Sequence, residues 1–356
     1  MGKQKKKPQS KLVDFRIRHP RWFRFLAIVI CLVIAWIVAA WASWGLSSTK
    51  QTYTFATSFS VPQAQQFGND WKANYTALLD DMKIRQFRLM SYWSRYEAER
   101  GKIDLSELDW QMDEAAKRGA KVSLAIGLRQ PRWPECHEPA WSTELSQSDW
   151  RQALYAYMEI VVKRYKDHPA LETFQLENES QAWYFGDCRE QPNPERVREE
   201  FGLVKQWLGS THIPIWMSLS DQYGPPIGYP EADAYGYSLY TKVYNNLIPG
   251  TYVEPSPPVW FHQGRGALVK AVTGKPLFLH ELQLEPWGSK FIAEMTTQQQ
   301  QETMSVERIH YNLEFARKFD VEQIYTWGSE WWYWAKIHGQ PEVWNTVKAE
   351  VEASKR

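Results

Sequence analysis

The sequence predicts an α/β protein, a single (β/α)₈ TIM barrel preceded by one N-terminal transmembrane helix. Three observations predict this fold. The length of 356 residues fits one large barrel. Strand-like and helix-like stretches alternate from residue 53 to near the end, and one long uncharged stretch lies near the N-terminus. We therefore expect a basic cytoplasmic segment (1–24), a transmembrane signal anchor (25–46), a linker (47–52) and the barrel (53–356).

The N-terminal segments predict a membrane anchor. Residues 1–24 hold nine Lys or Arg against one acid, and residues 25–46 carry no charge. A helix of that length is about 33 Å long, enough to cross the bilayer and contact its lipids. The basic side stays in the cytoplasm, so the rest of the chain is expected outside it. Ala40-Trp41-Ala42 resembles a cleavage site, but the long apolar stretch favours an uncleaved anchor.

The remaining chain carries a net charge of about −7, which argues against a nucleic-acid partner. Clustered metal-ligand spacing, a P-loop and a dinucleotide fingerprint are all missing from the sequence, so we predict no metal and no cofactor.

Two cysteines, Cys136 and Cys188, lie in the part expected outside the cytoplasm, while Cys31 lies in the apolar segment. Cysteines in an oxidising compartment often pair. A disulfide would close a loop of about 53 residues and contribute roughly 4 kcal/mol on the chain-entropy model. Two free thiols are the alternative.

The barrel strands are read from short apolar runs that alternate with amphipathic stretches. Between these runs, apolar residues recur at helical spacing, as at Leu108, Met112 and Ala115 before Gly119. Prolines between the fifth and sixth runs leave room for little helix there. The expected strands are Thr54–Ser60, Gln86–Tyr92, Lys121–Ile126, Thr173–Asn178, Ile213–Leu219, Ala234–Tyr240, Pro276–Glu281 and Gln323–Trp327.

Two expected strands deliver carboxylates to their ends, where barrel enzymes place catalytic groups. The fourth ends near Glu179 and the seventh at Glu281. A carboxylate on an apolar strand is costly unless it has a partner or a task. Such a pair is what glycosidic cleavage requires. Glu285 and Glu330 are rivals for the second position, and either acid alone could be an ordinary loop residue.

Asn178-Glu179 at the end of the fourth strand, with Glu281 at the end of the seventh, resembles clan A of the glycoside hydrolases, which includes family 5 cellulases and mannanases. The resemblance covers most of residues 53–345. It implies that Glu179 is the general acid/base and Glu281 the nucleophile, with retention of anomeric configuration. It also implies that Asn178 contacts the sugar 2-hydroxyl.

Further positions are similar to the same clan. Arg88 on the second strand resembles the arginine that keeps the nucleophile ionised. Tyr240, with Tyr237 as second choice, resembles the tyrosine that hydrogen-bonds the nucleophile. Trp327 resembles the tryptophan at the floor of the catalytic subsite. Each of these residues could instead be an ordinary part of the packed barrel.

The chain contains 20 tryptophans, too many for core filling alone. Several follow expected strands on the catalytic side, among them Trp93 and Trp287. Aromatic faces stack against the apolar face of a pyranose, so as a set these residues favour a carbohydrate site, although any single one could serve packing.

The function predicted from the sequence is a membrane-anchored retaining β-glycoside hydrolase. It would act on an extracytoplasmic oligo- or polysaccharide by double displacement with two glutamates. The alternative is a non-catalytic glycan-binding or cell-envelope protein on the same scaffold. Both explain the tryptophans, but only the enzyme needs Glu179 and Glu281 together.

Overall fold

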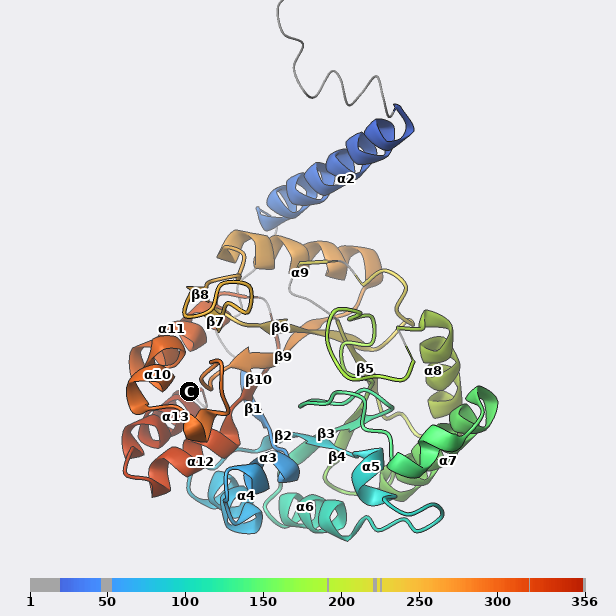
Figure 1. Ribbon diagram of the computed structural model, residues 1–356, viewed down its shortest axis with the longest axis vertical. Helices are drawn as coiled ribbons and strands as arrows, with labels where there is room; N and C mark the ends of the chain where they lie inside the picture. The colour runs from blue at the N-terminus through green and yellow to red at the C-terminus, as the bar shows by residue number, and fades with distance from the viewer. Residues whose placement is uncertain are drawn as a thin grey trace, which may run out of the picture.

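The computed structural model describes residues 20–45, 53–190, 192–219, 223–224, 226–319 and 321–354. Most of the basic segment and the linker therefore lie outside the described residues. Eight parallel strands form a closed barrel in the order β1-β10-β9-β6-β5-β4-β3-β2 (Figure 1). This closed barrel confirms the predicted fold class.

Each expected strand overlaps one barrel strand: Lys121–Ile126 and Gln323–Trp327 match in full, and the others differ at one or both ends by a few residues. The apolar runs are buried on both faces, as expected for parallel strands covered by helices. The barrel strands are β1 (Thr54–Ser58), β2 (Gln86–Met90), β3 (Lys121–Ile126), β4 (Leu171–Leu176), β5 (Ile215–Ser218), β6 (Ala234–Leu239), β9 (Leu277–Gln283) and β10 (Gln323–Trp327).

Helices surround the barrel and bury one apolar face each against it. Leu108, Met112 and Ala115 are fully buried on one such face. Gly119 follows that helix at φ 65°, a conformation that glycine adopts without strain. The described helices of the barrel are α3 (Val61–Gln66), α4 (Trp71–Asp80), α5 (Trp93–Tyr96), α6 (Ser106–Lys117), α7 (Gln147–Tyr165), α8 (Pro194–Leu208), α9 (Val259–Thr273), α10 (Thr297–Thr303), α11 (Val306–Arg317), α12 (Ser329–Ile337) and α13 (Pro341–Ala353), with short 3₁₀ turns η1 (Ala140–Glu144) and η2 (Ile292–Glu294).

Two connections depart from the simple alternation. The described residues between β5 and β6 form no helix, in line with the prolines there. Between β6 and β9 the chain first makes an antiparallel hairpin, β7 (Val243–Tyr244) and β8 (Tyr252–Val253), before α9.

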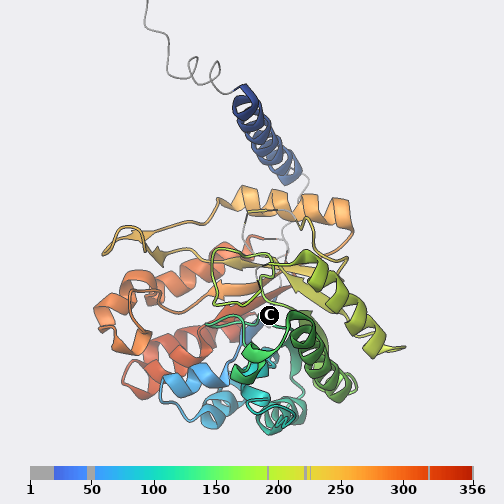
Figure 2. The ribbon, with the colours of Figure 1, turned by 45° about the vertical axis from the view of Figure 1, so that its right-hand side comes forward.

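The apolar N-terminal segment forms α2 (Pro20–Trp44), a helix of 25 residues that is long and apolar enough to span a membrane. It rises away from the barrel beside α9 (Figure 2). Ala40 is fully buried there, and a Cβ added to Gly264 of α9 would lie only 1.7 Å from the Ala40 carbonyl oxygen. Glycine therefore allows the two backbones to meet.

Candidate active site

The candidate site begins where β4 ends. The segment Glu177-Asn178-Glu179 bends there, with Glu177 at φ 57° and Glu179 at φ 45°. Left-handed backbone is unfavourable for residues other than glycine and tends to occur at functional sites.

A buried anchor holds this bend. The carboxylate of Glu177 accepts hydrogen bonds from the backbone N–H groups of Leu128 (2.6 Å) and Arg129 (3.1 Å), and from Arg196 (3.1 Å). Gly127 makes room for it, because a Cβ there would lie 2.5 Å from Glu177 Oε1. Glu177 is thus a structural carboxylate that fixes the two residues after it.

Glu281, on β9, has a partner for each carboxylate oxygen. Arg88 Nη1 donates to Oε1 at 3.0 Å, and the Tyr240 hydroxyl donates to Oε2 at 2.7 Å. Burial, and then the charge of Glu281, raises the pKa of Tyr240 well above its usual value, so the phenol keeps its proton. Of the two tyrosines considered, the structure brings Tyr240 to Glu281, whereas Tyr237 stacks on His262.

Asn178, just after the end of β4, is hydrogen-bonded to residues of β2 and β5. Its Oδ1 accepts from Arg88 Nη2 at 2.7 Å and from Ser218 Oγ at 3.2 Å. Arg88 is fully buried, so one guanidinium orients both Asn178 and Glu281.

Glu179 faces Glu281 across the side chain of His280. The Nε2 atom of His280 lies 3.8 Å from Glu179 Oε1, and its Nδ1 lies 3.7 Å from Glu281 Oε1. Both carboxyl groups therefore lie within 4 Å of the same imidazole ring.

The surroundings of Glu179 favour its protonated form. Burial, and then the charge of Glu281, raises the pKa of Glu179 well above its usual value. Ser238 Oγ donates a hydrogen bond to Glu179 and lies 3.2 Å from His280 Nε2. Burial lowers the pKa of His280, and the positive charge of Arg88 lowers it further, so this imidazole is neutral.

Both carboxyl groups line one cavity of about 830 Å³. Tyr240, Trp287 and Trp327 also line it, and Trp287 meets Tyr240 edge to face at 5.1 Å between ring centroids. A cavity of this size suits a small-molecule ligand.

Trp93, predicted to bind substrate, requires a correction. Its side chain is fully buried, its Nε1 donates to Glu97 at 2.7 Å, and it packs edge to face on Trp141. Because α5 turns this ring into the core, Trp93 has no face for a sugar.

Trp327 lines the cavity, and the side chain of Arg132 lies over its ring. The guanidinium of Arg132 lies 3.9 Å from the centre of the Trp327 ring. Arg132 also hydrogen-bonds Glu285 and Glu330. Glu285 and Glu330, the two rivals for the second catalytic position, are thus committed to an ion-pair cluster with Arg132.

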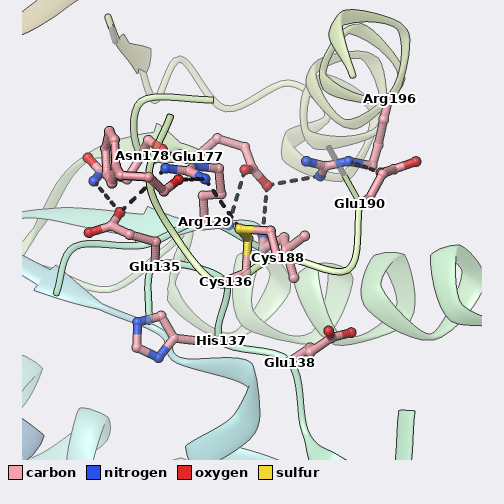
Figure 3. The surroundings of a disulfide bond; sticks show 12 residues. Arg129, Glu135, Cys136, His137, Glu138, Glu177, Asn178, Cys188, Glu190 and Arg196 are labelled. Atoms are coloured by element: carbon pink, nitrogen blue, oxygen red, sulfur yellow. Dashed lines mark hydrogen bonds and ion pairs between the residues drawn. A yellow bond between two sulfur atoms is a disulfide. The ribbon is translucent and has the colours of Figure 1, made fainter. Parts of the chain in front are cut away.

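Cys136 and Cys188 form a disulfide that joins the loop after β3 to the loop after β4 (Figure 3). Glu135, which directly precedes Cys136, points toward Asn178, and Asn178 Nδ2 donates to Glu135 Oε2 at 3.0 Å. Glu135 therefore joins Glu179, Glu281 and Glu285 among the carboxyl groups that line this cavity.

Sequence reasoning missed several residues of this site, among them Ser238, His280 and Glu135. A signal existed for Ser238, because it precedes Tyr240 by two positions and a strand turns such positions to one face. His280 directly precedes Glu281 on the same strand. Glu135 lies in an irregular loop, where no periodic pattern in the sequence predicts which way a side chain points.

Within the described residues, no group of three or more His, Cys, Asp or Glu is arranged to hold a metal ion. The groups at this site that can take part in chemistry include its carboxyl groups, the neutral imidazole of His280 and the buried Arg88.

The solved structures that resemble this chain include glycoside hydrolases. One is the exo-β-1,4-mannosidase Op5Man5 from Opitutaceae bacterium strain TAV5, with a TM-score of 0.53, 17% identity and coverage of 77% of this chain and 51% of that one. Another is a GH5_18 protein from Bifidobacterium longum subsp. infantis, with a TM-score of 0.52, 12% identity and coverage of 78% and 69%. A third is a GH5_18 protein from Streptomyces cattleya in complex with GlcNAc, with a TM-score of 0.51, 15% identity and coverage of 79% and 71%.

These identities establish the fold alone. The chain spans about half the length of the mannosidase. No family model and no curated protein matches the sequence. The class that fold and comparisons define is the glycosidase-like (β/α)₈ barrel.

Proposed function

We propose that this chain is a membrane-anchored, retaining β-glycoside hydrolase related to clan A and similar to its family 5. The observation that carries the proposal is the placement of Glu281. Arg88 and Tyr240 hold its two oxygens, and Glu179 faces it across His280. An ionised carboxylate opposite a protonated carboxyl is the arrangement that double displacement requires.

The proposed reaction has two steps. In the first, Glu281 attacks the anomeric carbon while Glu179 gives its proton to the departing glycosidic oxygen, which leaves a glycosyl ester on Glu281. In the second, Glu179 takes a proton from water, and the resulting hydroxide displaces Glu281 from the sugar. Arg88 and Tyr240 hold the carboxylate of Glu281 in position for both steps.

The proposed substrate is a β-linked oligo- or polysaccharide. Trp133 and Trp287 are 72% and 41% exposed and line the cavity, where their rings are available to stack on sugars.

We further propose the domain organisation predicted from the sequence, with the anchor in the bilayer and the barrel outside the cytoplasm. The apolar side chains along α2 are mostly exposed, which is favourable in lipid and costly in water. A disulfide between Cys136 and Cys188 is suited to an oxidising compartment. Carbonate extraction of membranes tests the anchor: the full chain should stay with the membranes, and a chain lacking residues 1–46 should be released.

Covalent trapping tests the chemistry. A 2-fluoro β-glycoside with an activated leaving group should label Glu281 and no other carboxylate. Glu179→Ala should lose activity, and azide should restore turnover as a glycosyl azide, because a small anion needs no general base. Binding of glycans without turnover or labelling across a broad panel favours the non-catalytic alternative.

A further inference from the structure

α9 differs from other helices of the barrel, such as α8, in the charge that it carries. Its 15 residues include two that are basic, Arg265 and Lys270, and none that is acidic. Arg265 is buried, so Lys270 is the one charged residue on the exposed part of this helix. α8 is also 15 residues long, and it holds six charged residues, of which four are exposed. α9 therefore lacks the charged outer face that a helix in contact with water normally has.

The side of α9 that faces away from the barrel is apolar along its whole length. His262 and Val269 are buried on the barrel side. On the opposite side, residues three or four apart in the sequence share one face of the helix. The members of this outer face are Trp260, Gly264, Ala267, Leu268 and Ala271. Gly264 is buried, Ala271 is exposed and the other three are partly exposed, so the barrel itself leaves this face uncovered.

The anchor helix α2 meets the outer face of α9 near its middle. Ala40 of α2 lies against Gly264, where a Cβ would come within 1.7 Å of the Ala40 carbonyl oxygen. Ala40 is the buried residue of α2, and the rest of that helix rises away from α9 (Figure 2). α2 therefore fixes where a bilayer lies relative to α9 without burying the rest of the outer face.

The position of Ala40 along α2 sets the depth of α9 in the bilayer. Ala40 lies 16 residues after Arg24, the last charged residue before the apolar stretch. At about 1.5 Å per residue this distance is about 24 Å, whereas the hydrocarbon core is about 30 Å thick. With Arg24 at the cytoplasmic boundary, Ala40 and Gly264 lie about 6 Å inside the opposite boundary. Helices that lie in the interface bury their apolar face by about 5–10 Å, so α9 has the depth of such a helix.

The segment around Tyr223 extends the same surface. Arg265 of α9 donates a hydrogen bond to the Gly224 carbonyl at 2.7 Å, which ties this segment to α9. The indole N–H of Trp36, one turn before Ala40 on α2, donates to the Tyr223 carbonyl at 3.1 Å. Tyr223 and Ile227 are 45% and 75% exposed. Exposed apolar side chains beside a membrane helix are costly in water and favourable in lipid.

We infer that the outer face of α9, together with Tyr223 and Ile227, is a second membrane-contacting surface, through which the barrel rests on the phospholipid leaflet where α2 leaves the bilayer. The inference rests on the proposed function, since it takes α2 to be a membrane anchor. It adds a contact between the barrel itself and lipid, so that the barrel lies with one side on the bilayer instead of hanging from a free linker.

Fluorescence quenching in vesicles tests this contact. The full-length protein, on a Cys31→Ser background, carries a fluorophore at one introduced cysteine and is reconstituted in phosphatidylcholine with brominated acyl chains. A label at Ala271→Cys should be quenched severalfold more strongly than a label at Ser106→Cys, because bromine on the acyl chains quenches by contact. Ser106 begins α6, which lies on the opposite side of the barrel from α9 (Figure 1).

Ala271→Asp tests the same face by its chemistry. A carboxylate is unfavourable in the hydrocarbon region, so this change should weaken the quenching of a label at Ile227→Cys. Gln206→Asp is the matched control, because Gln206 is exposed and, like Ala271, lies two residues before the end of its helix. It should leave the label at Ile227→Cys as strongly quenched as before, and equal effects of the two changes overturn the inference.

A label on the native Cys31 of α2 separates the inference from the proposed anchor. Quenching at Cys31 without quenching at Ala271→Cys leaves the anchor standing and overturns the inference. If Cys31 is not quenched, the anchor fails and the inference fails with it. Equal quenching at Ala271→Cys and Ser106→Cys also overturns it. So does an Ala271→Cys chain that forms disulfide-linked dimers while its label stays unquenched, since the outer face of α9 then joins two copies of this chain.

Discussion

The hydroxyl of Tyr240 lies 2.7 Å from Oε2 of Glu281, while the other oxygen of that carboxylate is bound to Arg88. Two donors from different strands therefore orient one carboxylate. The phenol comes from the end of β6 and the guanidinium from β2, so the barrel itself fixes the orientation of this carboxylate.

Tyr240→Phe removes only this donor. We expect kcat/KM for an aryl β-glycoside to fall about 10- to 100-fold, because a hydrogen bond to a charged group that reacts is lost. Tyr237→Phe is the matched control, since Tyr237 lies on the same strand and contacts His262 and Arg265 instead. Steady-state kinetics of the two variants checks the prediction, and equal losses in both would contradict it.

Ser238→Ala should move the pH dependence of activity. The hydrogen bond from Ser238 lowers the pKa of Glu179, against the larger rise caused by burial and by Glu281. Without that bond the pKa of Glu179 rises further, and Glu179 stays protonated to a higher pH. The basic limb of the kcat/KM profile should therefore shift to higher pH. A basic limb that stays at the same pH, or moves to lower pH, would contradict the prediction.

Glu135→Gln should change how stability depends on pH. Burial, and then the charge of Glu281, raises the pKa of Glu135 to about 8 in the folded protein. The folded state thus holds a proton that the unfolded chain, with a carboxyl pKa of about 4.3, releases. This contribution to stability is complete below the unfolded pKa and decreases by up to about 1.4 kcal/mol per pH unit as pH rises to the folded pKa.

Glutamine at this position cannot lose a proton. The free energy of unfolding of the variant, relative to the wild type, should therefore increase between pH 5 and pH 8. Urea denaturation at a series of pH values measures the difference. If the free energies of unfolding of the variant and the wild type change in parallel between pH 5 and pH 8, the expected linkage is excluded.

Replacing both cysteines of the disulfide, Cys136→Ser with Cys188→Ser, should reduce the free energy of unfolding by about 2–5 kcal/mol. It should also loosen Glu135, because Cys136 is the next residue. We therefore expect a loss of activity beyond the loss of stability, measured by kinetics at a temperature where the variant is folded. Cys31→Ser, at the free cysteine of α2, is the control and should behave as the wild type.

The amino-acid sequence determined the barrel, because apolar runs and helical spacing are local patterns that report which faces are buried. It also determined that Glu179 and Glu281 share one mouth, since parallel strands of a barrel end on the same side. Arg88 and Asn178 came instead from the resemblance to clan A, because strand-end reasoning alone gives neither residue a role.

Only the tertiary structure decided which side chains meet inside that mouth. Tyr240 rather than Tyr237 reaches Glu281, and Trp93 turns into the core. Glu135 joins the site from a loop that the disulfide and left-handed backbone direct inward. Such contacts join residues far apart in the chain, and their direction depends on loop conformation and packing, which no short-range pattern in the sequence encodes.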